Sequence, residues 1–135
     1  MTFRKIIDYL IEKNHEFYVE KGDYTYSVDA KPGVHAPNEN YLDVESIEPT
    51  YIPKILIKSS SKDMANELSD YLLSNFGKDI AVKVNTLNNG IYAVDVNSNE
   101  VSKANAIEFL IDYLNLNKSE IVAIGDNMND ISLFE

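Results

Sequence analysis

Four consecutive apolar residues, Ile121 to Ile124, run directly into Gly125 and a group of carboxylates and amides. Because this run shows no alternation of polar and apolar residues, it predicts a strand over residues 120–124 that is buried on both faces, as in a parallel sheet. Ser102 is the expected cap of a preceding helix. The apolar stripe of that helix consists of Ile107, Leu110, Ile111 and Leu114. One helix and one strand cannot close a core, so this part needs neighbours that the other residues do not supply.

Residues 1–97 carry a different pattern, in which short alternating stretches are interspersed with stretches of helical spacing. The predicted elements are, in chain order, a helix over 3–11, a hairpin over 15–28, a strand over 53–60, a helix from Ser60 or Ser61 to Gly77, and two strands over 79–87 and 90–96. Three prolines and the lack of sustained periodicity predict that residues 29–51 are mostly loop, with one helical turn at most.

These patterns predict an α/β chain made of two parts. Residues 1–97 are expected to form an α+β domain with an open, mostly antiparallel sheet. Residues 98–102 are mostly polar and are expected to form a linker. Residues 103–135 would then supply part of a parallel α/β core.

The composition excludes several classes of function. The formal charge is −10, from 22 acidic and 12 basic side chains, which argues against a nucleic acid partner because phosphates would be repelled. The absence of cysteine excludes disulfide frameworks and thiolate metal sites, and it is compatible with a reducing compartment. Since the sequence has no signal-peptide core and no apolar run of about 18 residues, we expect a cytoplasmic protein without a membrane partner.

The polar group after the apolar run is the candidate site. In open parallel sheets, ligands bind beyond the carboxyl ends of the strands, which is where Asp126 would lie. Asn127 or Asp126 can cap a helix that begins near Met128, which would place Asn129 and Asp130 at the same crevice. Lys103, at the start of the preceding helix, could point its ammonium there. Two carboxylates across such a turn suit Mg²⁺, which binds carboxylates together with water and phosphate.

The formal charges indicate that this site needs a metal. Lys103, Asp126 and Asp130 sum to −1, which would repel a phosphate, whereas a bound divalent cation brings the sum to +1. The alternative of a plain turn stays open, because glycine, aspartate and asparagine are also ordinary residues of turns and helix caps. In that alternative Lys103 is a solvated helix lysine.

Residues 101–135 resemble the third and fourth motifs of the haloacid dehalogenase superfamily, in the Cof-type branch with a type IIB cap. Their sequence is VSKANAIEFLIDYLNLNKSEIVAIGDNMNDISLFE. That branch shows a lysine that opens a helix, and then a strand that leads into a Gly-Asp-x-x-Asn-Asp turn. The α+β domain is similar to the cap of this branch in element order and position. The resemblance implies a cap over 1–97 and a partial Rossmann-like core over 103–135.

Members of this family are Mg²⁺-dependent phosphatases of small phosphorylated metabolites such as sugar phosphates, and they react through an aspartyl-phosphate. The resemblance implies that Lys103 contacts the phosphoryl oxygens and that Asp126 is the direct Mg²⁺ ligand. It also implies that Asp130 orients Lys103 and holds a metal-bound water, while Asn129 supports the phosphate.

The sequence also departs from the family. The first motif, an Asp-x-Asp that supplies the nucleophile and the general acid, is absent, and so is the Ser or Thr of the second motif. We therefore expect a fragment of a longer phosphatase that is inactive by itself, which leaves open whether this chain is an enzyme. The alternative is a non-catalytic module that binds a small ligand or a partner. Apolar residues of the helix at 107–111, exposed beside an unpaired strand, predict a homodimer or a domain-swapped pair.

Overall fold

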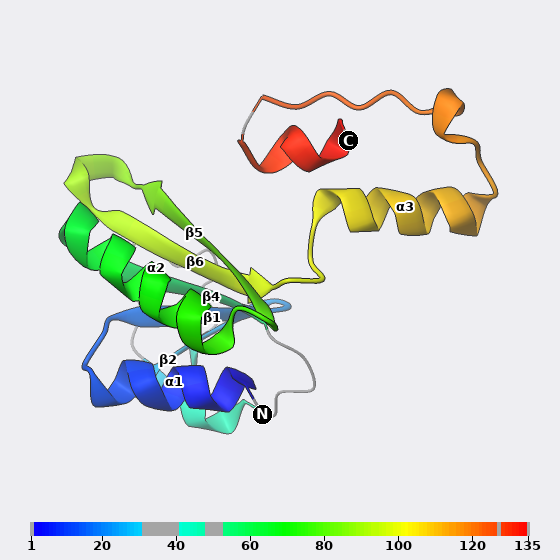
Figure 1. The fold of residues 1–135 in the computed structure, drawn as a ribbon. Coiled ribbons are helices and arrows are strands. Elements are labelled where there is room, and N and C mark those ends of the chain that lie inside the picture. Colours follow the sequence, from blue (N-terminus) through cyan, green and yellow to red (C-terminus); the bar gives the residue numbers. More distant parts are fainter. Residues whose placement is uncertain (1, 31–40, 48–52, 127, 135) are drawn as a thin grey trace. The chain divides into compact units, whose positions relative to one another are not determined.

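The computed structural model describes residues 2–30, 41–47, 53–126 and 128–134 (Figure 1). The chain forms two compact units, Met1–Asn99 and Glu100–Glu135, which we call the first unit and the second unit. Within the described ranges the longest helix has 15 residues, and none of the helices has the length and apolar character that crossing a membrane requires.

Two helices and six strands lie in the described residues of the first unit. They are α1 (Thr2–Glu12), β1 (Phe17–Lys21), β2 (Tyr24–Ser27), β3 (Tyr41–Asp43), β4 (Lys54–Ser59), α2 (Lys62–Phe76), β5 (Ile80–Thr86) and β6 (Tyr92–Ser98). Single 3-10 turns occur at Val28–Ala30, Val44–Ser46 and Asn88–Gly90. The predicted helices, hairpin, middle strand and final strand pair are thus confirmed. β6 ends at Ser98, the first residue of the predicted linker.

The six strands form one sheet in the order β3-β2-β1-β4-β6-β5. Neighbouring strands are antiparallel, except that β3 pairs with β2 in parallel. The sheet is therefore mostly antiparallel, as the sequence predicts. Both α1 and α2 cover one face of it, so that the first unit has a helical layer and a sheet layer (Figure 1).

The core of the first unit lies between these two layers. Val19 of β1 pairs with Ile55 of β4, which in turn pairs with Val96 of β6, and each of these three side chains is 0% exposed. The helices contribute Phe3, Ile6, Ile7, Leu10, Ala65, Leu68 and Leu72 to the same cluster. Burying one large aliphatic side chain stabilises a fold by about 1.5–3 kcal/mol, so apolar burial is the main source of stability in this unit.

The helix α2 begins where the sequence predicts. The side chain of Ser61 accepts a hydrogen bond from the Met64 N–H (3.1 Å), which satisfies one of the backbone donors that a helix start leaves unpaired. Met64 itself is apolar, yet it is 55% exposed. It precedes the buried Ala65 by one position, or about 100° of rotation around the helix.

The loop predicted for residues 29–51 is only partly correct, because β3 lies within that range. β3 has three residues, and Leu42 pairs with Tyr26 of β2. A strand this short shows no alternation that a sequence pattern can detect. The expected single helical turn is present as the 3-10 turn Val44–Ser46. Residues 31–40 and 48–52 lie outside the described residues.

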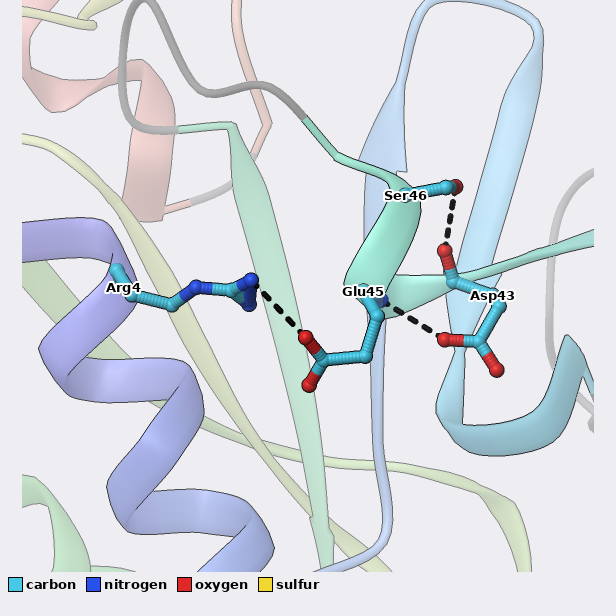
Figure 2. Close-up of polar contacts among 4 residues, drawn as sticks. All are labelled: Arg4, Asp43, Glu45 and Ser46. Carbon is cyan, nitrogen blue, oxygen red and sulfur yellow. Dashed lines mark hydrogen bonds and ion pairs between the residues drawn. The ribbon is translucent and has the colours of Figure 1, made fainter.

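Side chains and backbone around the turn Val44–Ser46 tie it to α1, as Figure 2 shows. The carboxylate of Asp43 caps the turn by accepting a hydrogen bond from the Glu45 N–H (2.8 Å), and the Ser46 hydroxyl donates to the Asp43 carbonyl (2.6 Å). Glu45 in turn pairs with Arg4 of α1 at 3.0 Å. The turn thus packs Val44, which is 1% exposed, into the core.

In residues 100–126 and 128–134 of the second unit, the structure has α3 (Lys103–Leu114) and two 3-10 helices, η4 (Lys118–Glu120) and η5 (Met128–Leu133). The predicted cap of α3 is confirmed, since Ser102 Oγ accepts a hydrogen bond from the Asn105 N–H (3.0 Å). The helix ends at Asn115, which adopts a left-handed conformation (φ 53°), a common way to terminate a helix.

The strand predicted for residues 120–124 is wrong. In the described part of the second unit no strand is assigned, and the side chains of Val122 and Ile124 are 86% and 90% exposed. A strand exists only where another strand accepts and donates its backbone hydrogen bonds. The apolar run therefore has the composition of a buried strand, but residues 100–126 and 128–134 offer it no pairing strand.

Candidate active site

The second unit brings together two of the predicted site residues that lie 27 positions apart. Lys103 is the first residue of α3, because the cap at Ser102 starts the helix there. Asp130 lies in η5. The Lys103 ammonium donates a hydrogen bond to Asp130 Oδ1, and the two side chains form an ion pair. The contact thus connects the start of α3 to the segment that follows the apolar run.

Both carboxylate oxygens of Asp130 have partners. Oδ1 contacts Lys103, and Oδ2 accepts a hydrogen bond from the backbone N–H of Asp126 at 3.2 Å. Asp130 is only 4% exposed. A buried carboxylate is costly unless hydrogen bonds and an opposite charge satisfy it, and both conditions are met here. Asp130 therefore fixes the Lys103 ammonium and the Asp126 backbone at the same time.

The Lys103 side chain is more exposed than its partner. Its exposed fraction is 51%, against 6% for the Asp130 side chain. Solvent therefore screens the ion pair, and its contribution to stability is small. An ammonium group carries three N–H donors, and the contact with Asp130 uses one of them. The remaining donors can reach an anion from the solvent side.

The other predicted site residues are placed less completely. Asp126 is exposed, it is separated from the apolar run by Gly125, and its backbone contacts Asp130. The backbone of Asn129 belongs to η5, whereas its side chain lies outside the described residues. The cap proposed from Asn127 also falls on a residue that is not described. The structure thus brings Lys103, Asp126 and Asp130 together, and the roles of all four residues stay predictions.

The carboxylates at this position fit a magnesium ion in part. Asp126 supplies an exposed carboxylate, while Asp130 is buried with its oxygens on Lys103 and the Asp126 N–H. Mg²⁺ is commonly held by one or two protein carboxylates, with water and phosphate completing its octahedron. No group of three His, Cys, Asp or Glu suited to a metal occurs among the described residues. Of the two aspartates at this position, the exposed Asp126 could act as a metal ligand, and the buried Asp130 is engaged by its two hydrogen-bond partners.

A groove of about 540 Å³ lies within the second unit. Its apolar lining comes from Ile107, Ile111, Ile121, Ala123, Leu133 and Phe134. No residue of α3 is buried, and two residues of the predicted apolar stripe, Ile107 and Ile111, border this groove. The predicted helix is confirmed, and its apolar stripe finds no core within the described part of this unit, as the sequence led us to expect: Leu110 is 46% exposed.

Sequence reasoning missed one polar group of the site, the backbone N–H of Asp126. It donates to a carboxylate four residues later, whereas the sequence suggested that a side chain at 126 or 127 caps the helix that follows. The spacing of four residues between the two aspartates was the available signal, because it is short enough for a side chain to reach back to a backbone donor.

Comparisons with known proteins identify the family of the chain. A family model described as haloacid dehalogenase-like hydrolase matches residues 1–135. The chain is 31% identical over 75 residues to an uncharacterised protein of Mycoplasma capricolum subsp. capricolum, covering 56% of this chain and 28% of that protein. It is 25% identical over 84 residues to YxeH of Bacillus subtilis, named as a candidate phosphatase, covering 62% of this chain and 29% of YxeH.

Two solved structures, each described as a haloacid dehalogenase-like hydrolase, share the fold. The first, from Bacteroides thetaiotaomicron, has a TM-score of 0.68 and 16% identity, and the match covers 96% of this chain and 50% of that one. The second, from B. subtilis, has a TM-score of 0.66 and 18% identity, with 97% and 55% coverage. The chain spans about half the length of these structures, and less than a third of the two curated relatives.

Proposed function

The chain belongs to the haloacid dehalogenase-like hydrolases, and from this premise we propose that it forms part of a Mg²⁺-dependent phosphatase of small phosphorylated metabolites such as sugar phosphates. The observation that carries the proposal is the contact of the Lys103 ammonium with the buried Asp130 carboxylate, beside Asp126. An oriented cation next to a carboxylate that can hold a metal suits a phosphoryl group. The name of the relative YxeH supports the same reaction class.

In this proposal Lys103 binds the phosphoryl oxygens and offsets the negative charge that develops on them in the transition state. Asp130 orients the Lys103 ammonium, because a buried and doubly hydrogen-bonded carboxylate is a rigid anchor for a long side chain. Asn129 contributes a polar contact to the phosphate. Lys103 thus acts on the substrate directly, and Asp130 acts through it.

Asp126 is the residue of this chain that would hold Mg²⁺ directly. When bound, the ion supplies the positive charge that turns the local formal sum from −1 to +1 and allows a phosphate to approach. The hydrogen bond from the Asp126 N–H to Asp130 fixes the backbone from which that carboxylate projects.

The nucleophile of the reaction would come from outside these 135 residues. In the proposed reaction an aspartate oxygen attacks phosphorus, the bond to the leaving alcohol breaks, and water then hydrolyses the aspartyl-phosphate to free phosphate. The chain has no Asp-x-Asp sequence. We therefore propose that it does not turn over substrate by itself, and that the whole phosphatase works in the cytoplasm.

A magnesium titration of the whole chain, followed by NMR, tests the site. We expect Mg²⁺ to shift the backbone amide signals of residues 125–131 and Asp126→Ala to abolish those shifts. Asp112→Ala is the matched control, because it removes another exposed aspartate of the second unit, on α3. Shifts that survive Asp126→Ala contradict the assigned ligand. Turnover of p-nitrophenyl phosphate by the wild-type chain, lost in Asp126→Ala, contradicts the claim that the nucleophile is missing.

A further inference from the structure

Gly125 lies between the apolar run and Asp126, and it is packed against Asp130. A Cβ atom built on Gly125 would lie 2.7 Å from Cγ and 2.9 Å from Oδ2 of Asp130, and the Cβ of Asp130 would be closer still. Carbon atoms in van der Waals contact are about 3.5–4.0 Å apart, so no side chain fits here while Asp130 keeps its position. The carboxylate of Asp130 thus lies in the space that a side chain at position 125 would fill.

Space, and not backbone conformation, is the reason for glycine at this position. Gly22 and Gly90 have φ angles of +60° and +73°, which other residues adopt only with strain, and a Cβ there would meet nothing within 4 Å. Gly125 is not among the glycines with positive φ. Its backbone is open to any residue, and only the position of Asp130 excludes a side chain.

Asp130 cannot give way without breaking the site. It is 4% exposed, Oδ1 contacts the Lys103 ammonium, and Oδ2 accepts from the Asp126 N–H. The atoms that a new methyl group would meet are the Cβ and the carboxylate, so rotating only the end of the side chain does not relieve the overlap. Relief requires that Asp130 move as a whole, away from one or both partners.

We propose that Gly125 is a positioning residue of the site, and that the space left by its missing side chain seats the Asp130 carboxylate against both Lys103 and the Asp126 backbone. The role of this arrangement in the reaction rests on the proposed function, whereas the packing of Gly125 against Asp130 does not depend on it. One carboxylate links the amine that would contact phosphate to the residue that would hold Mg²⁺. Gly125 therefore controls both residues through a single neighbour.

The substitution Gly125→Ala tests this in the whole chain, with NMR signals at the two partners of Asp130. We expect a new environment for the Lys103 side-chain nitrogen. We also expect the Asp126 amide to exchange with solvent about tenfold faster, the effect of losing roughly one hydrogen bond. The control Gly77→Ala adds a methyl group against the Leu73 backbone at the end of α2 in the first unit, and it should leave both signals unchanged. Wild-type signals in Gly125→Ala would overturn the proposal.

A double-mutant cycle with Asp130→Gly asks whether Gly125 acts through Asp130. The reporter is amide exchange of Phe134, whose N–H donates to the Ile131 carbonyl (3.0 Å) at the end of η5. We expect Gly125→Ala to speed this exchange in the wild-type chain and to have no effect in the Asp130→Gly background, where the obstructing atoms are gone. Asp130→Gly is used because Asp130→Ala would keep the Cβ of residue 130, which is the atom nearest to a methyl group at position 125.

Equal effects of Gly125→Ala in both backgrounds would overturn the proposal. If Gly125→Ala alone does not fold, the comparison of the double variant with Asp130→Gly still shows whether Gly125 acts through Asp130. A folded double variant supports the proposal, and an unfolded one overturns it. None of these signals depends on metal or turnover, so a failed Mg²⁺ titration would remove the proposed function and leave this inference in place.

Discussion

The two units of the chain bury opposite kinds of side chain. In the first unit the buried residues are almost all apolar, and they join α1, α2 and the sheet in one core. In the second unit Asp130 is the only buried residue among the side chains that are described there. Both units have capped helices with apolar faces. The difference teaches that local signals suffice to start and stop a helix, while a core also needs a second layer to cover the apolar face.

The largest expected difference between the units is in the response to losing a leucine from a helix. Leu72→Ala in α2 removes a side chain that is 0% exposed, and Leu114→Ala in α3 removes one that is 56% exposed. We expect the first to lower the free energy of unfolding by about 2–5 kcal/mol, from lost burial and a cavity. The second should change it by less than about 0.5 kcal/mol. Urea unfolding followed by circular dichroism measures both.

The leucine pair also tests whether α3 lies in a core in solution. Both variants shorten the same residue type in an α-helix, so helix propensity cancels between them. A loss at Leu114 as large as that at Leu72 would contradict the exposure of α3 and would mean that something covers it.

Self-association would reduce the difference in apolar burial between the two units, because a second copy of the chain would cover the exposed apolar run of the second unit. We propose that the isolated chain dimerises through residues 121–124, where Val122 and Ile124 are exposed and no charged residue adds to the repulsion of two acidic chains. Sedimentation should then depend on concentration. Val122→Glu should raise the dissociation constant by about tenfold or more, since a charge would be buried at the contact.

A matched change on the other unit makes this test specific. Tyr24→Glu places the same charge on an exposed residue of β2 and should leave the association unchanged. A wild-type chain that sediments as a monomer at every concentration contradicts the dimer. It would also weaken the alternative of an interaction module, which needs this surface.

The fold of the first unit was largely predictable because its signals are local. The spacing of Phe3, Ile6 and Leu10 defines α1, and Ser61 marks the start of α2. β3 was not predictable, since three residues carry no periodicity and the strand exists only by pairing with β2. The strand prediction at residues 121–124 was wrong because strand formation also depends on pairing, which the sequence pattern does not show. The composition of this run alone is that of a strand.

That the candidate site residues lie near one another could be predicted from the sequence, whereas the hydrogen bonds that connect them could be predicted only in part. The sequence placed Lys103 and Asp130 in one crevice, and the structure puts them in contact. It did not foresee that Asp130 would be buried or that its second oxygen would bind the Asp126 N–H. Such a bond depends on how the backbone turns after Gly125, and a sequence pattern carries no information about the space around a glycine.

The smallest expected effect concerns the two serine caps, which are alike in geometry. Ser61 accepts from Met64 at 3.1 Å, and Ser102 accepts from Asn105 at 3.0 Å. We expect Ser61→Ala to lower the free energy of unfolding by about 1 kcal/mol, because α2 unfolds together with the core of the first unit.

Ser102→Ala removes the same bond, yet it should not move the main urea transition, because α3 has no buried residue that couples it to a core. Its effect should appear as faster hydrogen exchange of the Asn105 amide alone. Ser61→Ala supplies the reference, because it measures how much free energy of unfolding this protein loses when a serine cap is removed. Equal shifts of the main transition in the two variants would mean that both units unfold as one cooperative system. The first unit would then depend on α3, and the division of the chain into one unit with a core and one without would not describe its stability.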